Sequence, residues 1–164
     1  MTQGWRWSIL PPAMPPEHTD EARRIFLAAP FALDLGLELE SLGPGSCVSS
    51  MAISPRHLQQ DGYVHAGVQA TIADHTAGAA GATLVPRDRI VLSIEFKINL
   101  LRPATGDRLV CRAQVLRPGR NVIVAESEVL VSSGSGERLV SKATVTLAVV
   151  PRPSPAARPA ASPT

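Results

Sequence analysis

The second half of the chain contains four strand-length runs in succession, and this feature restricts the possible fold most. Residues 89–101, 107–117, 121–133 and 137–150 are rich in Val, Ile and Thr, which favour extended backbone. The connections RPATG, PGR and SGSG separate them, and such short Pro- and Gly-containing segments favour tight turns between antiparallel strands. Two further runs, residues 33–42 and 46–54, predict an earlier hairpin. The sequence therefore predicts about six antiparallel strands.

One long helical segment interrupts the strands, from residue 67 to about residue 84. Its apolar and small residues recur at helical spacing, and Pro86 closes the segment. The residues at this spacing are Val68, Ile72, His75, Ala79 and Ala82. A single long helix among strands joined by tight turns predicts an α+β architecture, in which an antiparallel sheet wraps around one buried helix.

The two ends of the chain differ from the middle in composition. Residues 1–19 are a Pro-rich lead-in, and residues 151–164 are a Pro/Ala/Ser tail that we expect to be disordered. Residues 20–150 are expected to form one domain. It begins with a short helix over residues 21–29, which Thr19 or Asp20 caps and Pro30 ends.

The overall composition excludes several classes of protein. A net charge of +2 over 164 residues, without a basic run, argues against nucleic-acid binding. No run is long enough to cross a membrane, and prolines interrupt the N-terminus before an apolar signal segment forms. Cys47 and Cys111 have no metal-site spacing and indicate ordinary buried thiols in a reducing compartment. The sequence predicts a cytoplasmic protein.

An ionisable residue stands within a stripe of very small side chains on the long helix. Gly67, Ala70, Asp74, Gly78 and Gly81 share one helical face. Each interior glycine costs about 0.5–1 kcal/mol relative to Ala, so we expect a second helix or a ligand to approach this face closely. A carboxylate in such a contact is costly to desolvate, which favours a functional role for Asp74.

The start of the same helix is a second candidate functional feature. The first amides, at Ala66 and Gly67, have no partner within the helix and lie at its positive end, as the donors of an oxyanion hole do. At 1.5 Å per residue, Ala66 and Asp74 are about 12 Å apart on one helix, too far to act on one carbonyl. The sequence therefore predicts a dimer whose active sites combine the amide of one copy with the Asp of the other.

The stretch GYVHAGVQATIADHTAGAA resembles the signature of the PaaI-type hotdog-fold acyl-CoA thioesterases, and the likeness extends from about Pro30 to Val150. The resemblance implies a hotdog fold and assembly as a homodimer or as a homotetramer of two dimers. It also implies a role for each matching residue. These are Asp74 as general base or nucleophile, the amide of Ala66 as the donor to the carbonyl, Gln59 as the residue that positions the attack, His65 as the motif histidine, and Ser93 as a hydroxyl on the next strand.

The resulting functional prediction is an acyl-CoA thioesterase that hydrolyses an acyl- or aryl-CoA to the free acid and coenzyme A. Coenzyme A is then part of the substrate, and no separate cofactor is expected. One alternative is a hotdog module that binds acyl-CoA without catalysis, although an Asp at position 74 argues against it. The other is a hotdog enoyl-CoA hydratase. Asp61 and His65 lie near each other as in such enzymes, but one residue too close, and the Asn-Pro of that pattern is absent.

Two other groups of polar residues are weaker candidates. His57, Asp61 and His65 would resemble a metal site on a helix, but Pro55 and Gly62 predict a loop, so no metal is expected. Arg117 and Arg120 flank the turn RPGR, where paired guanidinium groups could hold the phosphates of coenzyme A.

Overall fold

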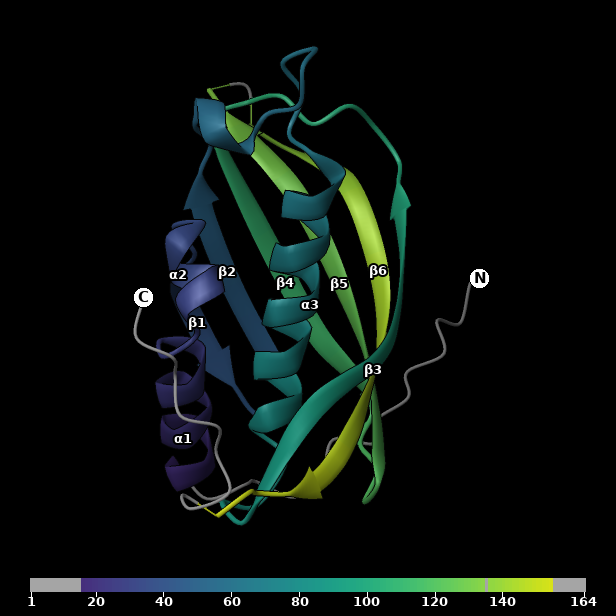
Figure 1. Cartoon of the computed structure of the whole chain (residues 1–164). Coiled ribbons are helices and arrows are strands. Elements are labelled where there is room, and N and C mark those ends of the chain that lie inside the picture. The colour runs from purple at the N-terminus through teal and green to yellow at the C-terminus, as the bar shows by residue number, and fades with distance from the viewer. Residues whose placement is uncertain (1–15, 135, 155–164) are drawn as a thin grey trace.

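The structure is a computed structural model, and it describes residues 16–134 and 136–154. A six-stranded antiparallel sheet curves around one long helix, α3 (Ala66–Ala82), as Figure 1 shows. The strands are β1 (Glu38–Gly43), β2 (Ser46–Ala52), β3 (Arg89–Leu100), β4 (Arg108–Arg117), β5 (Val122–Ser133) and β6 (Gly136–Pro151). Their order across the sheet is β1-β2-β4-β5-β6-β3, so that β1 and β3 form its edges. This arrangement confirms the predicted α+β hotdog fold.

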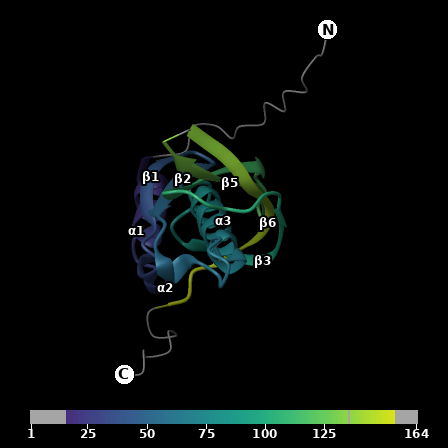
Figure 2. The ribbon, with the colours of Figure 1, turned by 90° about the horizontal axis from the view of Figure 1, so that it is seen from above.

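Helix α3 lies inside the curve of the sheet, as the view from above in Figure 2 shows. Ala73, Ala77 and Ala80 are fully buried, and their small side chains allow the helix axis to approach the strands closely. Ser127 on β5 donates a hydrogen bond of 2.8 Å to the carbonyl of Ala73. The core therefore lies between α3 and the concave face of the sheet.

Two short helices precede the sheet, α1 (Pro16–Phe26) and α2 (Pro30–Asp34). Helix α1 begins five residues before the predicted start at Glu21 and ends at Phe26, and Pro16 is compatible with the first turn of a helix. Ala22 and Phe26, four residues apart, are buried on one side of α1. Helix α1 thus packs against α3 and adds a wall beside it.

Strand β3 has a register irregularity between Ser93 and Glu95 in its pairing with β6. Ser93 bonds to a residue of α3, and Phe96 lines a small cavity beside α3, although three positions separate them and strict alternation would place them on opposite faces. The extra residue at the bulge, Ile94, changes the alternation and turns both side chains toward the helix.

Two glycines of the predicted stripe on α3, Gly78 and Gly81, have different surroundings. A Cβ added at Gly81 would lie 2.5 Å from Cδ1 of Leu147, within the core. A Cβ added at Gly78 would meet no atom within 4 Å. Gly81 is therefore needed for packing against the sheet, whereas Gly78 leaves open space beside the helix.

This difference predicts opposite effects of the same substitution at the two glycines. Gly78→Ala should stabilise the protein by about 0.5–1 kcal/mol, because Ala favours the helix and meets no obstacle. Gly81→Ala should destabilise it, since the new methyl group must displace Leu147. Urea unfolding of both variants against the wild type checks this, and equal shifts of the two midpoints would contradict it.

The C-terminal end of the described chain is ordered further than residue 150. Pro151 pairs with Arg89, and the backbone amide of Arg152 donates to the carbonyl of Asp88 at 2.8 Å. The side chain of Arg152 reaches the carbonyl of Arg87 at 2.7 Å and Glu21 on α1 at 2.8 Å. The predicted start of the tail at Pro151 is thus too early, while residues 1–15 and 155–164 lie outside the described part.

Two smaller predictions concern the cysteines and membrane spans. Cys47 and Cys111 are free and buried, as predicted, and burial raises the pKa of each thiol to about 12. Among the helices of residues 16–134 and 136–154, none has the length and apolar character needed to cross a membrane.

Candidate active site

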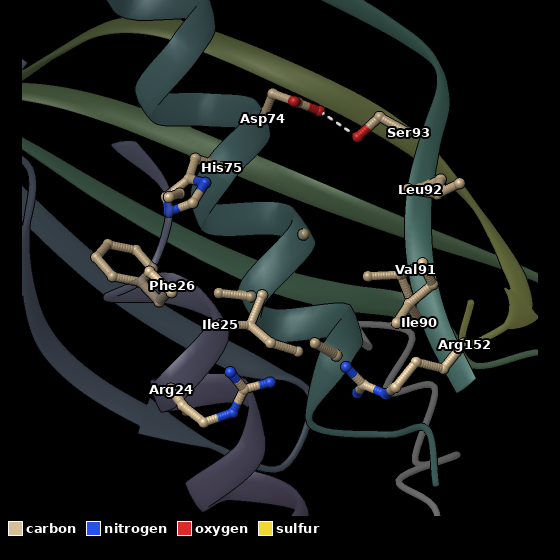
Figure 3. Close-up of a pocket in the computed structure, with 15 residues that line it drawn as sticks. Arg24, Ile25, Phe26, Asp74, His75, Ile90, Val91, Leu92, Ser93 and Arg152 are labelled. Atoms are coloured by element: carbon tan, nitrogen blue, oxygen red, sulfur yellow. Dashed lines mark hydrogen bonds between the residues drawn. The ribbon is translucent and has the colours of Figure 1, made fainter. Parts of the chain in front are cut away.

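Asp74 lies in the middle of α3, half-buried, on the side that faces the edge strand β3. The hydroxyl of Ser93 donates a hydrogen bond of 2.6 Å to Oδ1 of Asp74, the contact drawn in Figure 3. Such a bond orients the carboxylate and leaves its other oxygen available for a further proton. Helix and edge strand together therefore present one carboxylate–hydroxyl pair.

This pair lies at one end of an open cleft of about 530 Å³ between α1, α3 and β3. Most of the lining is apolar or small, and the view in Figure 3 places Arg24 and Arg152 at the end opposite Asp74. The helix α1 wall was not foreseen from the sequence, because its residues precede Asp74 by about fifty positions and have no motif. The residues that line the cleft are Arg24, Ile25, Phe26, Ala28, Ala29, Asp74, His75, Gly78, Ala79, Ala82, Ile90, Val91, Leu92, Ser93 and Arg152.

The amide groups at the start of α3 have different partners. Gly67 donates to Nδ1 of His65 at 2.9 Å, and Val68 and Gln69 donate to the carbonyl of His65. Among the described residues, the amide of Ala66 has no hydrogen-bond partner. Because the peptide is planar and trans, this N–H points opposite to the His65 carbonyl, away from the helix. Ala66 thus offers a free, oriented donor at the positive end of α3.

His65 holds this helix start in place. It is the N-cap of α3, with φ −58° and ψ 140°, and its ring accepts the Gly67 amide proton. Its own backbone amide donates to the carbonyl of His57 at 2.8 Å. The ring of His65 therefore occupies the Gly67 amide, so that Ala66 is the donor left over.

Gln59 lies next to the same helix start. It shares a second pocket with Tyr63, His65, Ala66 and Arg102. The side-chain oxygen of Gln59 accepts the amide proton of Asp61 at 2.8 Å, in a turn that Gly62 completes with φ 81°. Its side-chain nitrogen has no hydrogen-bond partner among the described residues and can still act as a donor.

One chain keeps the two halves of the candidate site apart. Asp74 and Ser93 line the first cleft, whereas Gln59, His65 and Ala66 line the second pocket. Asp74 follows Ala66 by eight positions in one continuous helix, which corresponds to about 12 Å. The structure therefore groups the predicted residues into two sets within a protomer.

His75 follows Asp74 and packs against α1. Its ring centroid lies 4.5 Å from that of Phe26, and its Nε2 is buried without a hydrogen-bond partner among the described residues. Burial lowers the pKa of His75, and a backbone hydrogen bond with Phe26 and the nearby charge of Asp74 oppose this only in part. His75 is thus a packed residue at the cleft wall.

The lowered pKa of His75 predicts a loss of stability in acid. In the unfolded chain His75 binds a proton with the ordinary histidine pKa of about 6.5, whereas in the folded protein it binds a proton only at lower pH. The free energy of unfolding therefore falls as the pH drops below about 6.5. His57 is buried, has a lowered pKa and contributes in the same window. The free energy of unfolding is measured with urea at pH 7.5 and at pH 5.0. The difference between the two values should be smaller in His75→Phe than in the wild type. An unchanged difference would show that His75 does not contribute.

The remaining predicted groups lie elsewhere. Arg120 lines a hollow beside Leu84 and Arg89, beyond the C-terminal end of α3, and Arg117 ends β4. Neither lines the Asp74 cleft or the Ala66 pocket of the same protomer, so phosphate binding by them stays a prediction. His57 is buried, and its Nδ1 accepts the amide proton of Ser54 at 3.1 Å.

The chemistry of these groups is that of acyl transfer to water. A free helix-start amide can stabilise the oxyanion of a tetrahedral intermediate, and an oriented carboxylate can activate water or attack the carbonyl. A hotdog fold with these groups defines an ester or thioester hydrolase.

Comparison with known proteins identifies the family. Residues 61–138 match the model of the thioesterase superfamily. A thioesterase family protein from Silicibacter pomeroyi is 32% identical with a TM-score of 0.80, and the match covers 82% of this chain and 99% of that one. A 1,4-dihydroxy-2-naphthoyl-CoA hydrolase from Listeria monocytogenes is 26% identical, over 70% of this chain and 91% of the relative. The E. coli PaaI protein shares the fold, with a TM-score of 0.73 at 20% identity, over 84% and 96% of the two chains.

The protein belongs to the thioesterase superfamily and is a thioester hydrolase with the hotdog fold.

Proposed function

We propose that the protein hydrolyses the thioester bond of an acyl- or aryl-CoA and releases the free acid and coenzyme A. The observation that supports this most directly is the pair of complementary groups, the free Ala66 amide and the Ser93-bonded Asp74 carboxylate. The similarity to the Listeria hydrolase, whose name specifies a CoA thioester, supports the same substrate class.

In the proposed reaction, the thioester oxygen accepts the amide proton of Ala66 as a hydrogen bond. Asp74 takes a proton from water while the water oxygen bonds to the carbonyl carbon. The tetrahedral intermediate then expels the thiolate of coenzyme A, which takes up a proton. In a second route that stays open, the Asp74 carboxylate attacks the carbon and expels the thiolate, and water hydrolyses the resulting anhydride. Gln59 has a free amide nitrogen and is the proposed positioning group in both routes.

The two sets of groups meet only if two copies of the chain associate. A two-fold axis near Ala70 would place the α3 helices antiparallel, and the Ala66 of each copy would then reach the Asp74 of the other. The proposed site is thus shared, and each dimer contains two such sites.

The edge strand β3 is the proposed dimer contact. It is twelve residues long, its outer edge pairs with no other strand among the described residues, and it exposes apolar residues. Leu92, Ile94 and Phe96 are 52%, 62% and 43% exposed. A long apolar edge strand is a template for pairing with another chain, and Ser93 places this one directly beside Asp74. Assembly of two dimers and a cytoplasmic location are further parts of the proposal.

A panel of CoA esters tests the proposed activity. Purified protein should release free thiol from at least one of acetyl-, butyryl-, octanoyl-, decanoyl- and benzoyl-CoA, measured with a thiol reagent. Tight binding of these esters without thiol release would instead support the non-catalytic acyl-CoA module. Hydration of an enoyl-CoA with the thioester intact would support the hydratase.

A further inference from the structure

The cleft beside Asp74 continues well past the position where a thioester would react. Asp74, Gly78 and Ala82 follow one another at intervals of four residues, so they lie on one side of α3 and all three line the cleft. Figure 3 shows Asp74 at one end and Arg24 and Arg152 at the other. The space between them has no part in the proposed chemistry.

The floor of the cleft depends on Gly78. A Cβ added there would meet no atom within 4 Å, so the missing side chain is not required by a neighbour in the chain. Glycine within a helix is nevertheless unfavourable by about 0.5–1 kcal/mol relative to Ala. Gly78 therefore keeps the cleft open at a cost to helix stability.

The walls of the cleft are apolar on both sides. Helix α1 contributes Ile25 and Phe26, and the edge strand β3 contributes Val91, whose side chain points toward α3 in Figure 3. A cleft of this composition favours a hydrocarbon group, because burial of apolar surface gives about 25 cal/mol per Å². Charged groups are confined to its two ends, where Asp74 and the arginines lie.

The far end is a cluster of charges that are already paired. Glu21 bonds Arg24 at 2.7 Å and Arg152 at 2.8 Å, and Arg152 also donates to the carbonyl of Arg87. A hydrocarbon chain that passed these groups would strip water from them without replacing its hydrogen bonds. The cluster therefore sets a limit to the apolar length of the cleft.

The helix gives an estimate of this length. Ala82 follows Asp74 by eight residues, which corresponds to about 12 Å along the axis. An extended chain advances about 3.8 Å for every three bonds, so about ten bonds span the distance. A single aromatic ring would occupy only part of it.

We propose that this cleft binds an extended aliphatic acyl group of medium length, about eight to ten carbons, and that Gly78 determines specificity by admitting it. The inference rests on the proposed thioesterase function, since it places the acyl carbonyl at Asp74. The acyl chain then runs along α3 toward Ala82, between α1 and β3.

Gly78→Leu tests the assignment, because its side chain would fill the floor about 6 Å from Asp74. The measured quantity is the ratio of kcat/KM for decanoyl-CoA to kcat/KM for butyryl-CoA. Wild-type protein should prefer decanoyl-CoA, and the variant should lower the ratio at least about tenfold, as for a pocket that loses room for several methylenes. Gly78→Ala should shift the ratio in the same direction by a smaller factor, and it remains informative if the leucine variant does not fold.

Gly134→Leu is the matched control. Gly134 lies in the β5–β6 connection, where an added Cβ also meets no atom within 4 Å, and it does not line the cleft. Its ratio should equal that of the wild type. If Gly78→Leu lowered kcat/KM equally for both esters, the pantetheine arm would occupy the cleft. If kcat/KM did not change for either ester, the cleft would not be used. Either outcome overturns the inference while thioesterase activity persists, whereas a wild type inactive on all CoA esters would overturn the proposed function itself.

Discussion

Replacing Asp74 by Asn is expected to lower the rate of thioester hydrolysis about 10²–10⁴-fold, the usual contribution of a positioned general base. The Asn side chain has the same shape and can still accept the hydrogen bond from Ser93, so the packing of α3 should not change. It cannot take a proton from water, and it is a poor nucleophile. The loss should therefore appear in kcat, with little change in melting temperature.

Asp34→Asn provides the comparison for this variant. Asp34 is an exposed carboxylate at the end of α2 and does not line the Asp74 cleft. Free-thiol release and thermal melting are measured for both variants and the wild type. If Asp74→Asn kept activity within a few-fold of the wild type, Asp74 would not be the catalytic carboxylate.

The strands and the long helix were predictable because their sequence patterns are local. The predicted runs at residues 89–101 and 121–133 coincide within one or two residues with β3 and β5, since β-branched residues and short turns determine both. The helix around Asp74 was recognisable from the spacing of its apolar and small residues and from Pro86, which closes the segment. These features depend on residues that are close together in the sequence, so they can be recognised before the fold is known.

Features that depend on tertiary packing were not predictable from the same reasoning. Helical spacing assigned Gly78 and Gly81 to one face, but only the packed structure separates the open position from the one against Leu147. The Pro-rich composition after residue 150 suggested disorder. The side chain of Arg152 nevertheless forms an ion pair with Glu21 on α1 and a hydrogen bond with the carbonyl of Arg87, just before β3. The position of α1 beside the cleft was likewise not predictable, because it depends on contacts between segments that are distant in the sequence.

A shared active site predicts that two inactive variants restore activity when they form a mixed dimer. The first variant is Asp74→Asn, which keeps the Ala66 amide. The second is Ala66→Pro, which removes that amide proton and keeps Asp74. Proline suits this position, because Ala66 is the first residue of α3 and the preceding His65 has the extended φ −58° and ψ 140° that proline requires of its neighbour.

In the mixed dimer, one site combines the intact amide of the Asp74→Asn chain with the intact carboxylate of the Ala66→Pro chain. The other site lacks both groups. Random reassembly of equal amounts gives about half mixed dimers, each with one complete site, so the activity should reach about a quarter of the wild-type value.

The most direct measurement of the shared site is therefore the rate of thiol release by the reassembled mixture, with differently tagged chains to quantify the mixed dimers. We expect each parent variant to be nearly inactive and the activity to rise in proportion to the amount of mixed dimer. Mixed dimers that form in the expected amount but remain as inactive as either parent would contradict a site built from Ala66 of one chain and Asp74 of the other.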